Sequence, residues 1–235
     1  VDPDTVARAV ADADRAAARG RVEVRALHTL EELEEARGIW DAVWPTVAGA
    51  TEITQNLLRA VEHAGGYIGG AYAGSRMVGS CLAIVGRSKG EHGWHTHLHS
   101  HIAAALPGYA DRGIGTSLKL HQRAWALRHD IDRIVWTFDP LVRRNARLNL
   151  VKLGGIGVEY LVDFYGAMDD AVNAGDESDR LLLQWDLGSS RVTDALAGSA
   201  PALSRADWLA LGAVERIVAT DEGPRLHDAE AQVVL

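Results

Sequence analysis

The segment from His99 to Leu118 constrains the fold most, because a strand pattern there runs into a loop with two glycines and then into a helix pattern. At such a junction the first N–H groups of the helix have no partner within the helix, and the helix dipole attracts an anion. Gly113 and Gly115 lack the Cβ atoms that would hold a phosphate away, and Arg112 adds a positive charge. The segment therefore predicts a phosphate-binding loop.

Two well-known phosphate-loop patterns do not fit this segment. The nucleoside-triphosphate loop has the right spacing from Gly108 to Gly113, but Ile114 and Gly115 replace the required Lys and Ser/Thr. The dinucleotide fingerprint requires a third glycine where the chain has Leu118. Both are excluded, and an ordinary glycine-containing strand-to-helix turn remains the alternative to a phosphate loop.

Hydrophobic periodicity and turn residues predict an α/β protein with a mixed sheet that carries helices on its faces. Thr29 and Glu32 form a capping box, and Pro45 ends the helix that follows. Asp139-Pro140 is expected to open a later helix that ends at Gly154-Gly155. The other expected helices cover residues 4–19, 51–63 and 114–129, the strands cover 21–27, 67–73, 77–85, 95–105, 134–138, 158–164 and 181–187, and a polar loop covers 88–93.

The chain is expected to divide into three parts. Residues 1–20 form a helical appendage, residues 21–187 form the main domain, and residues 188–235 form a C-terminal extension. The Ser/Gly/Ala composition after Gly188 suggests a linker, followed by a small element around Trp208. The apolar tail Val233–Leu235 is expected to be a strand.

Composition excludes several classes of protein. The 235 residues are 47% hydrophobic, which is enough for a core, and the net charge of −8 gives no general electrostatic case for a nucleic-acid or membrane partner. The single cysteine, Cys81, excludes a disulfide framework and is expected to be a small core residue. No apolar run approaches the ~20 residues of a membrane span, and the first twenty residues lack a secretory apolar core. We expect a soluble cytoplasmic protein.

Pro107, Arg112, Gly113 and Gly115 match in register a signature of the GCN5-related N-acetyltransferase (GNAT) superfamily, which the segment resembles. Ala105 stands at the usual Val position, and Ala110 departs from the pattern. The element order from Arg21 to Leu187 is similar as well. Trp136–Leu141, Asn145, Asn149 and Ser178–Arg180 look like a little-characterised bacterial subfamily of acyltransferases, some relatives of which succinylate amino acids from succinyl-CoA.

The resemblance implies a central, mostly antiparallel, splayed sheet flanked by helices. It also implies an N-acyltransferase that uses acetyl-CoA or another acyl-CoA without a metal, acts on a small amine or amino acid, and is compatible with a homodimer. The pantetheine arm would pair with the backbone near Ala103 to Ala105 like an extra strand, where the strands of His101 and Trp136 part. The pyrophosphate would bind the backbone amides of Arg112, Gly113, Ile114, Gly115, Thr116 and Ser117.

Four histidines alternate from His95 to His101, so they would share one face of a strand. Histidine titrates near pH ~6.5, which suits a general base at neutral pH. His99 and His101 stand where arylalkylamine N-acetyltransferases carry His-x-His, which implies His101 as the base and His99 as its proton relay. Two alternatives stay open: histidines that only stabilise the fold, or a zinc pair in a metal-dependent hydrolase.

The helix near residue 145 holds further candidates. Asn145 lies on its apolar side and either contacts the cofactor or bonds the backbone, with Asn149 as the second candidate. At the position of Leu150, many family members have a tyrosine that acts as the general acid and protonates the CoA thiolate. In this chain Tyr160 or Tyr165 would take that role, or the thiolate would leave without an acid. Arg143, Arg144 and Arg147 could hold a carboxylate or be solvated. The missing tyrosine also keeps a catalytically silent CoA-binding or protein-binding module open.

Overall fold

The computed structural model describes residues 1–45, 53–90, 93–166, 178–199, 217–220 and 223–226. The chain divides into two compact units, Val1–Gly198 and Ser199–Leu235. Within the described residues, no helix is both long enough and apolar enough to cross a membrane.

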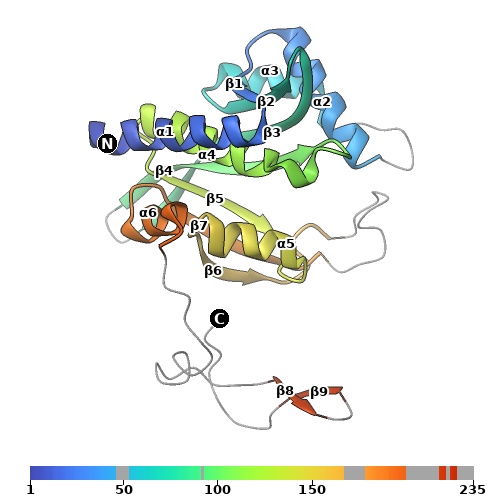
Figure 1. Cartoon of the computed structure of the whole chain (residues 1–235), viewed down its shortest axis with the longest axis vertical. Helices are drawn as coiled ribbons and strands as arrows, with labels where there is room; N and C mark the ends of the chain where they lie inside the picture. The colour runs from blue at the N-terminus through green and yellow to red at the C-terminus, as the bar shows by residue number, and fades with distance from the viewer. Residues whose placement is uncertain (46–52, 91–92, 167–177, 200–216, 221–222, 227–235) are drawn as a thin grey trace. The chain divides into compact units, whose positions relative to one another are not determined.

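A seven-stranded sheet organises the first unit (Figure 1). Its spatial order is β1-β2-β3-β4-β5-β7-β6, and every neighbouring pair is antiparallel except β4 and β5. The expected mixed, mostly antiparallel sheet is therefore confirmed. The strands are β1 (Glu23–Ala26), β2 (Tyr67–Ala73), β3 (Arg76–Gly90), β4 (Gly93–Ala105), β5 (Arg133–Phe138), β6 (Ile156–Leu161) and β7 (Arg180–Asp186).

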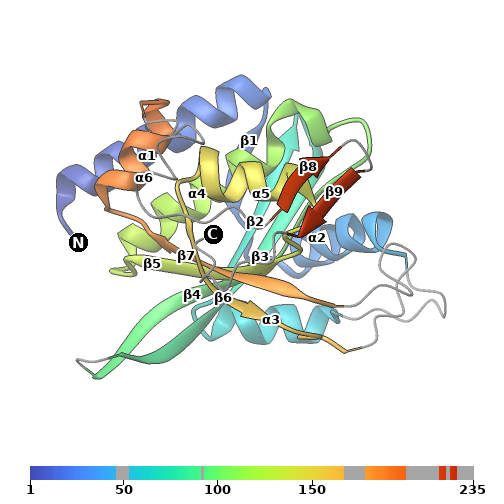
Figure 2. The ribbon, with the colours of Figure 1, turned by 90° about the horizontal axis from the view of Figure 1, so that it is seen from below.

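Helices cover both faces of the sheet (Figure 2). One face carries α1 (Pro3–Gly20), α4 (Ile114–Arg128), α5 (Arg143–Ala146) and α6 (Ser190–Ala197), and the other carries α2 (Leu30–Val43) and α3 (Gln55–His63). Each face has its own apolar core: Leu98 and Trp185 belong to the α1/α4 side, and Leu82 and Trp40 to the α2/α3 side. The capping box of Thr29 and Glu32 is present at α2.

Helix α1 docks along α4 and is part of the first unit. Asp2 caps its N-terminus by accepting hydrogen bonds from the amides of Asp4 and Thr5. Its buried face consists of small residues, which let the two helix backbones approach closely: Ala9, Ala13, Ala16 and Gly20. Because a helix of this length is marginal alone, docking on α4 stabilises it.

The prediction of a polar loop at residues 88–93 is wrong. The ladder between β3 and β4 continues to Ser88↔His95, Lys89↔Trp94 and Gly90↔Gly93, so the two strands form one long hairpin. Most side chains near its far end are exposed, on both faces of the strands. Alternation of apolar and polar residues is a signal of one buried face, and it disappears where neither face is buried.

Two further boundaries differ from expectation. Asp139 does not cap a helix: its Oδ1 accepts from the Leu141 amide at 2.8 Å, which holds a turn, and α5 begins only at Arg143. The linker expected after Gly188 contains α6, which Ser189 caps and whose Val192 is buried against the sheet. Between α5 and Leu153 the chain makes a π-helix, Arg147–Lys152.

The second unit contains a two-stranded antiparallel hairpin, β8 (Ile217–Thr220) and β9 (Gly223–Leu226). The sequence did not predict these strands. The element expected around Trp208 and the expected terminal strand Val233–Leu235 lie outside the described residues.

Candidate active site

Strands β4 and β5 pair over only two residues each and then diverge. Leu98 pairs with Ile134 and His99 with Val135, whereas the β3–β4 ladder on the other side of β4 runs to its end at Ala105. The β4 edge from Ser100 onward and the β5 edge from Trp136 onward thus have no mutual strand pairing. We call these two edges the strand divergence. The parting expected between the strands of His101 and Trp136 is confirmed.

A β-bulge at His101 coincides with the strand divergence. Ala83 pairs with Ser100 and Leu82 with Ile102, so His101 has no opposite residue. The bulge inverts the alternation of β4. Leu98 packs in the core on the α1/α4 side, whereas Ile102, an even number of residues later, packs on the α2/α3 side.

The glycine loop presents bare backbone at the start of α4. Gly113 caps the helix with φ +80°, and no side chain caps it. A Cβ placed on Gly113 would have no heavy atom within 4 Å, and one on Gly115 would meet only Leu148 Cδ2, at 3.9 Å. The first-turn amides of Ile114, Gly115 and Thr116 precede any possible intrahelical acceptor. This end of α4 fits a diphosphate.

The structure narrows the set of expected phosphate-binding amides. The Arg112 amide donates to Tyr109 O at 3.1 Å, and the Ser117 amide donates to Gly113 O at 3.0 Å. Ser117 is fully buried, and its hydroxyl donates to Ala16 O at 3.0 Å, on the α1 side. The Arg112 guanidinium lies over the Tyr109 ring, 4.6 Å from its centroid. Gly113 to Thr116 are the residues whose geometry leaves backbone for a ligand.

The four histidines have different surroundings. His95 Nε2 lies 3.1 Å from Asp132 Oδ1, and the His97 ring is buried over Gly86. The rings of His99 and His101 lie 6.3 Å apart at the strand divergence. Burial, helped by the charges of His101, His97 and Lys119, lowers the pKa of His99 to about 4, whereas the His101 side chain is exposed. His99 is therefore neutral at pH 7 and a weak base.

Helix α5 and the π-helix approach the glycine loop from the other side. Leu148 is the neighbour of Gly115, and Arg144 Nη1 lies 3.8 Å from Asp111 Oδ1 in an exposed ion pair. Asn145 is half-buried, whereas Asn149 is 5% exposed and its carbonyl accepts from the Gly155 amide at 3.0 Å. Arg143 and Arg147 are exposed.

The residues considered as substitutes for the missing tyrosine already have partners. Tyr160 donates to Asp179 Oδ2 at 2.5 Å, and Tyr165 Oη lies 3.1 Å from Thr137 Oγ1. Leu150 packs against the core on the α1/α4 side. Cys81 is fully buried, and burial raises the pKa of its thiol to about 12, so it is a core residue as expected.

Lys119 is a residue that the sequence reasoning missed. It is 7% exposed in the middle of α4, where its Nζ donates to Ser100 Oγ at 2.8 Å. A usable signal existed, because Lys119 lies four residues after Gly115 and next to Leu118, on the buried face of the helix. A charged residue at such a position is rare unless it is paired or functional.

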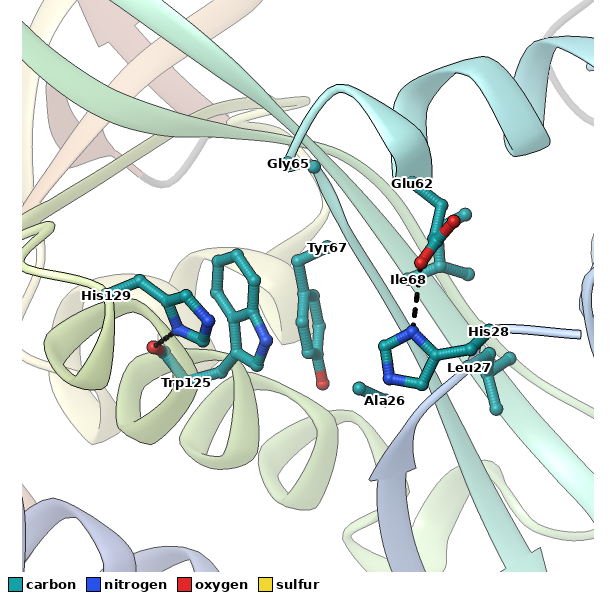
Figure 3. Close-up of a pocket in the computed structure, with 10 residues that line it drawn as sticks. Ala26, Leu27, His28, Glu62, Gly65, Tyr67, Ile68, Trp125 and His129 are labelled. Atoms are coloured by element: carbon teal, nitrogen blue, oxygen red, sulfur yellow. Dashed lines mark hydrogen bonds and ion pairs between the residues drawn. The ribbon is translucent and has the colours of Figure 1, made fainter.

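A separate hollow of about 160 Å³ lies at the other end of α4, among residues of β1, β2 and α3 (Figure 3). His28 Nδ1 lies 3.0 Å from Glu62 Oε1, and His129 stacks on Trp125 with ring centroids 3.9 Å apart. Its polar side chains already have partners within the protein, and none of the predicted site residues lines it. The candidate active site is therefore the strand divergence with the glycine loop.

No family model matches the sequence, and no curated protein matches it. Solved structures do match. The acetyltransferase of GNAT family from Streptococcus pneumoniae superposes with a TM-score of 0.53 at 14% identity, over 69% of this chain and 98% of that chain. The ribosomal-protein-S18-alanine N-acetyltransferase from Escherichia coli gives 0.54 at 13%, over 72% and 96%.

A third match is Arabidopsis thaliana Naa50 in complex with the bisubstrate analogue CoA-Ac-MVNAL. Its TM-score is 0.50 at 14% identity, over 70% of this chain and 97% of that chain. The matches nearly span their own chains, so the first unit has the complete GNAT fold. The fold expected from the glycine-loop signature is thereby confirmed.

Proposed function

We propose that the chain is an acyl-CoA-dependent N-acyltransferase that acts on a small amine or amino acid, with an acetyl or succinyl group as the acyl group. The strand divergence beside the bare N-terminus of α4 carries this proposal. The amides from Gly113 to Thr116 would bind the diphosphate, and the unpaired edge of β4 would pair with the amides of the pantetheine arm. Asn145, at the start of α5, would contact the same cofactor.

The reaction proceeds by direct attack of the amine on the thioester, without an acyl-enzyme. The amine passes its proton toward His101, which is exposed at the bulge and therefore able to face the acceptor side. Neutral His99 relays the proton. A backbone N–H on the unpaired edge of β4 polarises the carbonyl, a contribution that typically amounts to several kcal/mol when the donor is fixed in place.

Release of CoA thiol tests the function. Purified protein is incubated with acetyl-CoA or succinyl-CoA and a panel of amines and amino acids, and free thiol is measured with a thiol reagent. We expect at least one amine to accelerate release, and His101→Gln to lower the rate by about 10²-fold, as for loss of a general base. His95→Gln, next to Asp132, is the matched control and should keep the rate.

The second candidate is a CoA-binding module without catalysis, which Leu150 in the tyrosine position favours. The same assay separates the two functions. If CoA binds in calorimetry while no amine accelerates thiol release, the enzyme proposal fails and the binding module is the remaining function.

A further inference from the structure

The ammonium of Lys119 lies where β4 and β5 part. The last paired residues are His99 and Val135, and Ser100 and Trp136 come directly after them. Lys119 contacts both of these next residues: its Nζ donates to Ser100 Oγ at 2.8 Å and lies 3.7 Å from the centroid of the Trp136 ring. We consider a pantetheine arm of acyl-CoA that lies between the two strands, with its thioester toward the paired residues His99 and Val135. The thioester of such an arm ends beside the Lys119 ammonium.

Lys119 forms no ion pair within the described residues, so no carboxylate neutralises its charge there. The titratable groups that interact electrostatically with it are Cys81 from β3, whose thiol is hydrogen-bonded to the Tyr67 side chain of β2, and His99 from β4. Cys81 stays a thiol because burial raises its pKa, and His99 is neutral at pH 7. Burial lowers the pKa of Lys119 to about 7. An anionic atom at the divergence would supply the missing counter-charge.

We propose that Lys119 is the proton donor to the departing CoA thiolate, an inference that rests on the proposed N-acyltransferase function. As the amine nitrogen forms its bond to the carbonyl carbon, the C–S bond breaks and sulfur keeps the electron pair. The Lys119 ammonium gives its proton to this sulfur, becomes a neutral amine, and is reprotonated from water when CoA leaves. Lys119 would thus be the general acid that this chain lacks at the position of Leu150.

Lys119→Met tests this role, because methionine keeps the length and removes the proton. We expect kcat for thiol release to fall about 10–100-fold with little change in KM for acyl-CoA. In the wild type kcat falls on the alkaline side as Lys119 deprotonates, and Lys119→Met should lack this fall. Lys152→Met, an exposed lysine at the end of the π-helix, and Tyr165→Phe are the controls and should both keep the rate.

A second readout needs no turnover. In the complex with CoA, the Lys119 ammonium should lower the pKa of the bound thiol, so thiolate absorption in the ultraviolet appears at lower pH than for free CoA. Lys119→Met should shift this titration back toward the value of free CoA. The effect can be measured even if no acceptor amine is found.

Three results would overturn the inference. The first is an unchanged thiol titration in Lys119→Met, and the second is an active wild type whose kcat and pH profile survive that substitution. The third is an acylated Lys119 in mass spectra after incubation with acetyl-CoA, since the lysine would then be a nucleophile. A wild type that binds CoA and shifts its thiol pKa but acylates no amine would contradict the proposed function instead.

Discussion

Helix α4 carries two buried cations one turn apart, and their surroundings differ. Arg123 faces α1, where its Nη1 donates to Asp12 Oδ2 at 3.0 Å and its Nε to Leu187 O at 2.9 Å. Lys119 faces the strand divergence, where it has a hydroxyl and an aromatic ring but no carboxylate. Arg123 is thus paired with a carboxylate inside the protein, whereas Lys119 has no counter-charge among the described residues.

Under the proposed function, this difference separates residues that stabilise the fold from those that would bind the cofactor or react. Ser117 and Arg123 tie α1 to α4, and their polar groups are satisfied within the protein. The first-turn amides of α4 precede any intrahelical acceptor, and Lys119 binds Ser100 and Trp136 but has no carboxylate beside it among the described residues. Substitutions on the first side should therefore change stability, and substitutions on the second should change binding or rate.

The largest effect on stability is expected for Arg123→Met. The change leaves Asp12 Oδ2 and Leu187 O without this donor, while Asp12 Oδ1 keeps its ion pair with Arg15. We expect a loss of ~2–3 kcal/mol, below the ~3–5 for a fully buried pair. The reduction follows from Asp12, whose side chain is 19% exposed against 3% for Arg123. Denaturant unfolding measures it, with the exposed Arg128→Met as control. Lys119→Met should cost little, and equal losses in the two variants would contradict the comparison.

The pH dependence of stability should reveal the uncompensated lysine. The folded pKa of Lys119, about 7, lies below its ordinary value of 10.5, so between these values the unfolded chain binds more protons. The free energy of unfolding should therefore rise with pH above 7, by about 2 kcal/mol up to pH 8.5.

Other groups limit the useful pH window. The raised pKa values of Cys81 and Tyr67 act in the opposite direction above pH ~9, and the lowered pKa of His99 acts below pH ~6.5. Unfolding measured between pH 7 and 8.5 in wild type and Lys119→Met isolates the lysine. A slope that persists in the variant would contradict the assignment.

The smallest change in stability is expected at the glycine loop, where one substitution should mainly lower stability and the other should mainly lower CoA affinity. Gly113→Ala puts a side chain at φ +80° and should cost ~1 kcal/mol. Gly115→Ala places a methyl group on helical backbone in ordinary contact with Leu148 and should leave stability unchanged or raise it by up to ~0.5 kcal/mol.

Affinity separates the same two variants. The methyl group of Gly115→Ala would stand where the diphosphate approaches, so CoA affinity should fall about tenfold, which is ~1.4 kcal/mol. Calorimetry with CoA measures the affinity, and thermal unfolding the stability. Undiminished CoA affinity in Gly115→Ala would place the diphosphate elsewhere.

Much of the fold could be read from the sequence because its signals are local. The capping box at Thr29, the glycine ends of the helices and the short apolar run of β5 each depend on a few neighbouring residues. The segments that were predicted wrongly depend on contacts with residues far away in the sequence. The ladder to Gly90 exists because β4 runs beside it, and α6 because Val192 finds the sheet.

For the candidate site, too, local patterns could be predicted and contacts between distant residues could not. The glycine loop and the histidine row were visible as patterns, and the structure places His99 and His101 at the strand divergence. Lys119 carried no motif, and its position depends on Ser100 and Trp136 from two other elements. The hydrogen-bond partners of Tyr160 and Tyr165 could not be predicted from the sequence either. Asp179 and Thr137 come close to these tyrosines only in the folded protein.

The extra residue at His101 has a consequence for comparing this protein with others. From Ile102 onward, each side chain of β4 faces the side that strict alternation would give to its neighbour. An alignment that omits the bulge, or moves it by one position, would equate residues of opposite faces through Ala105. Deleting one residue here should exchange the inner and outer sides of the strand's end, so chain length at this point is as important as residue identity.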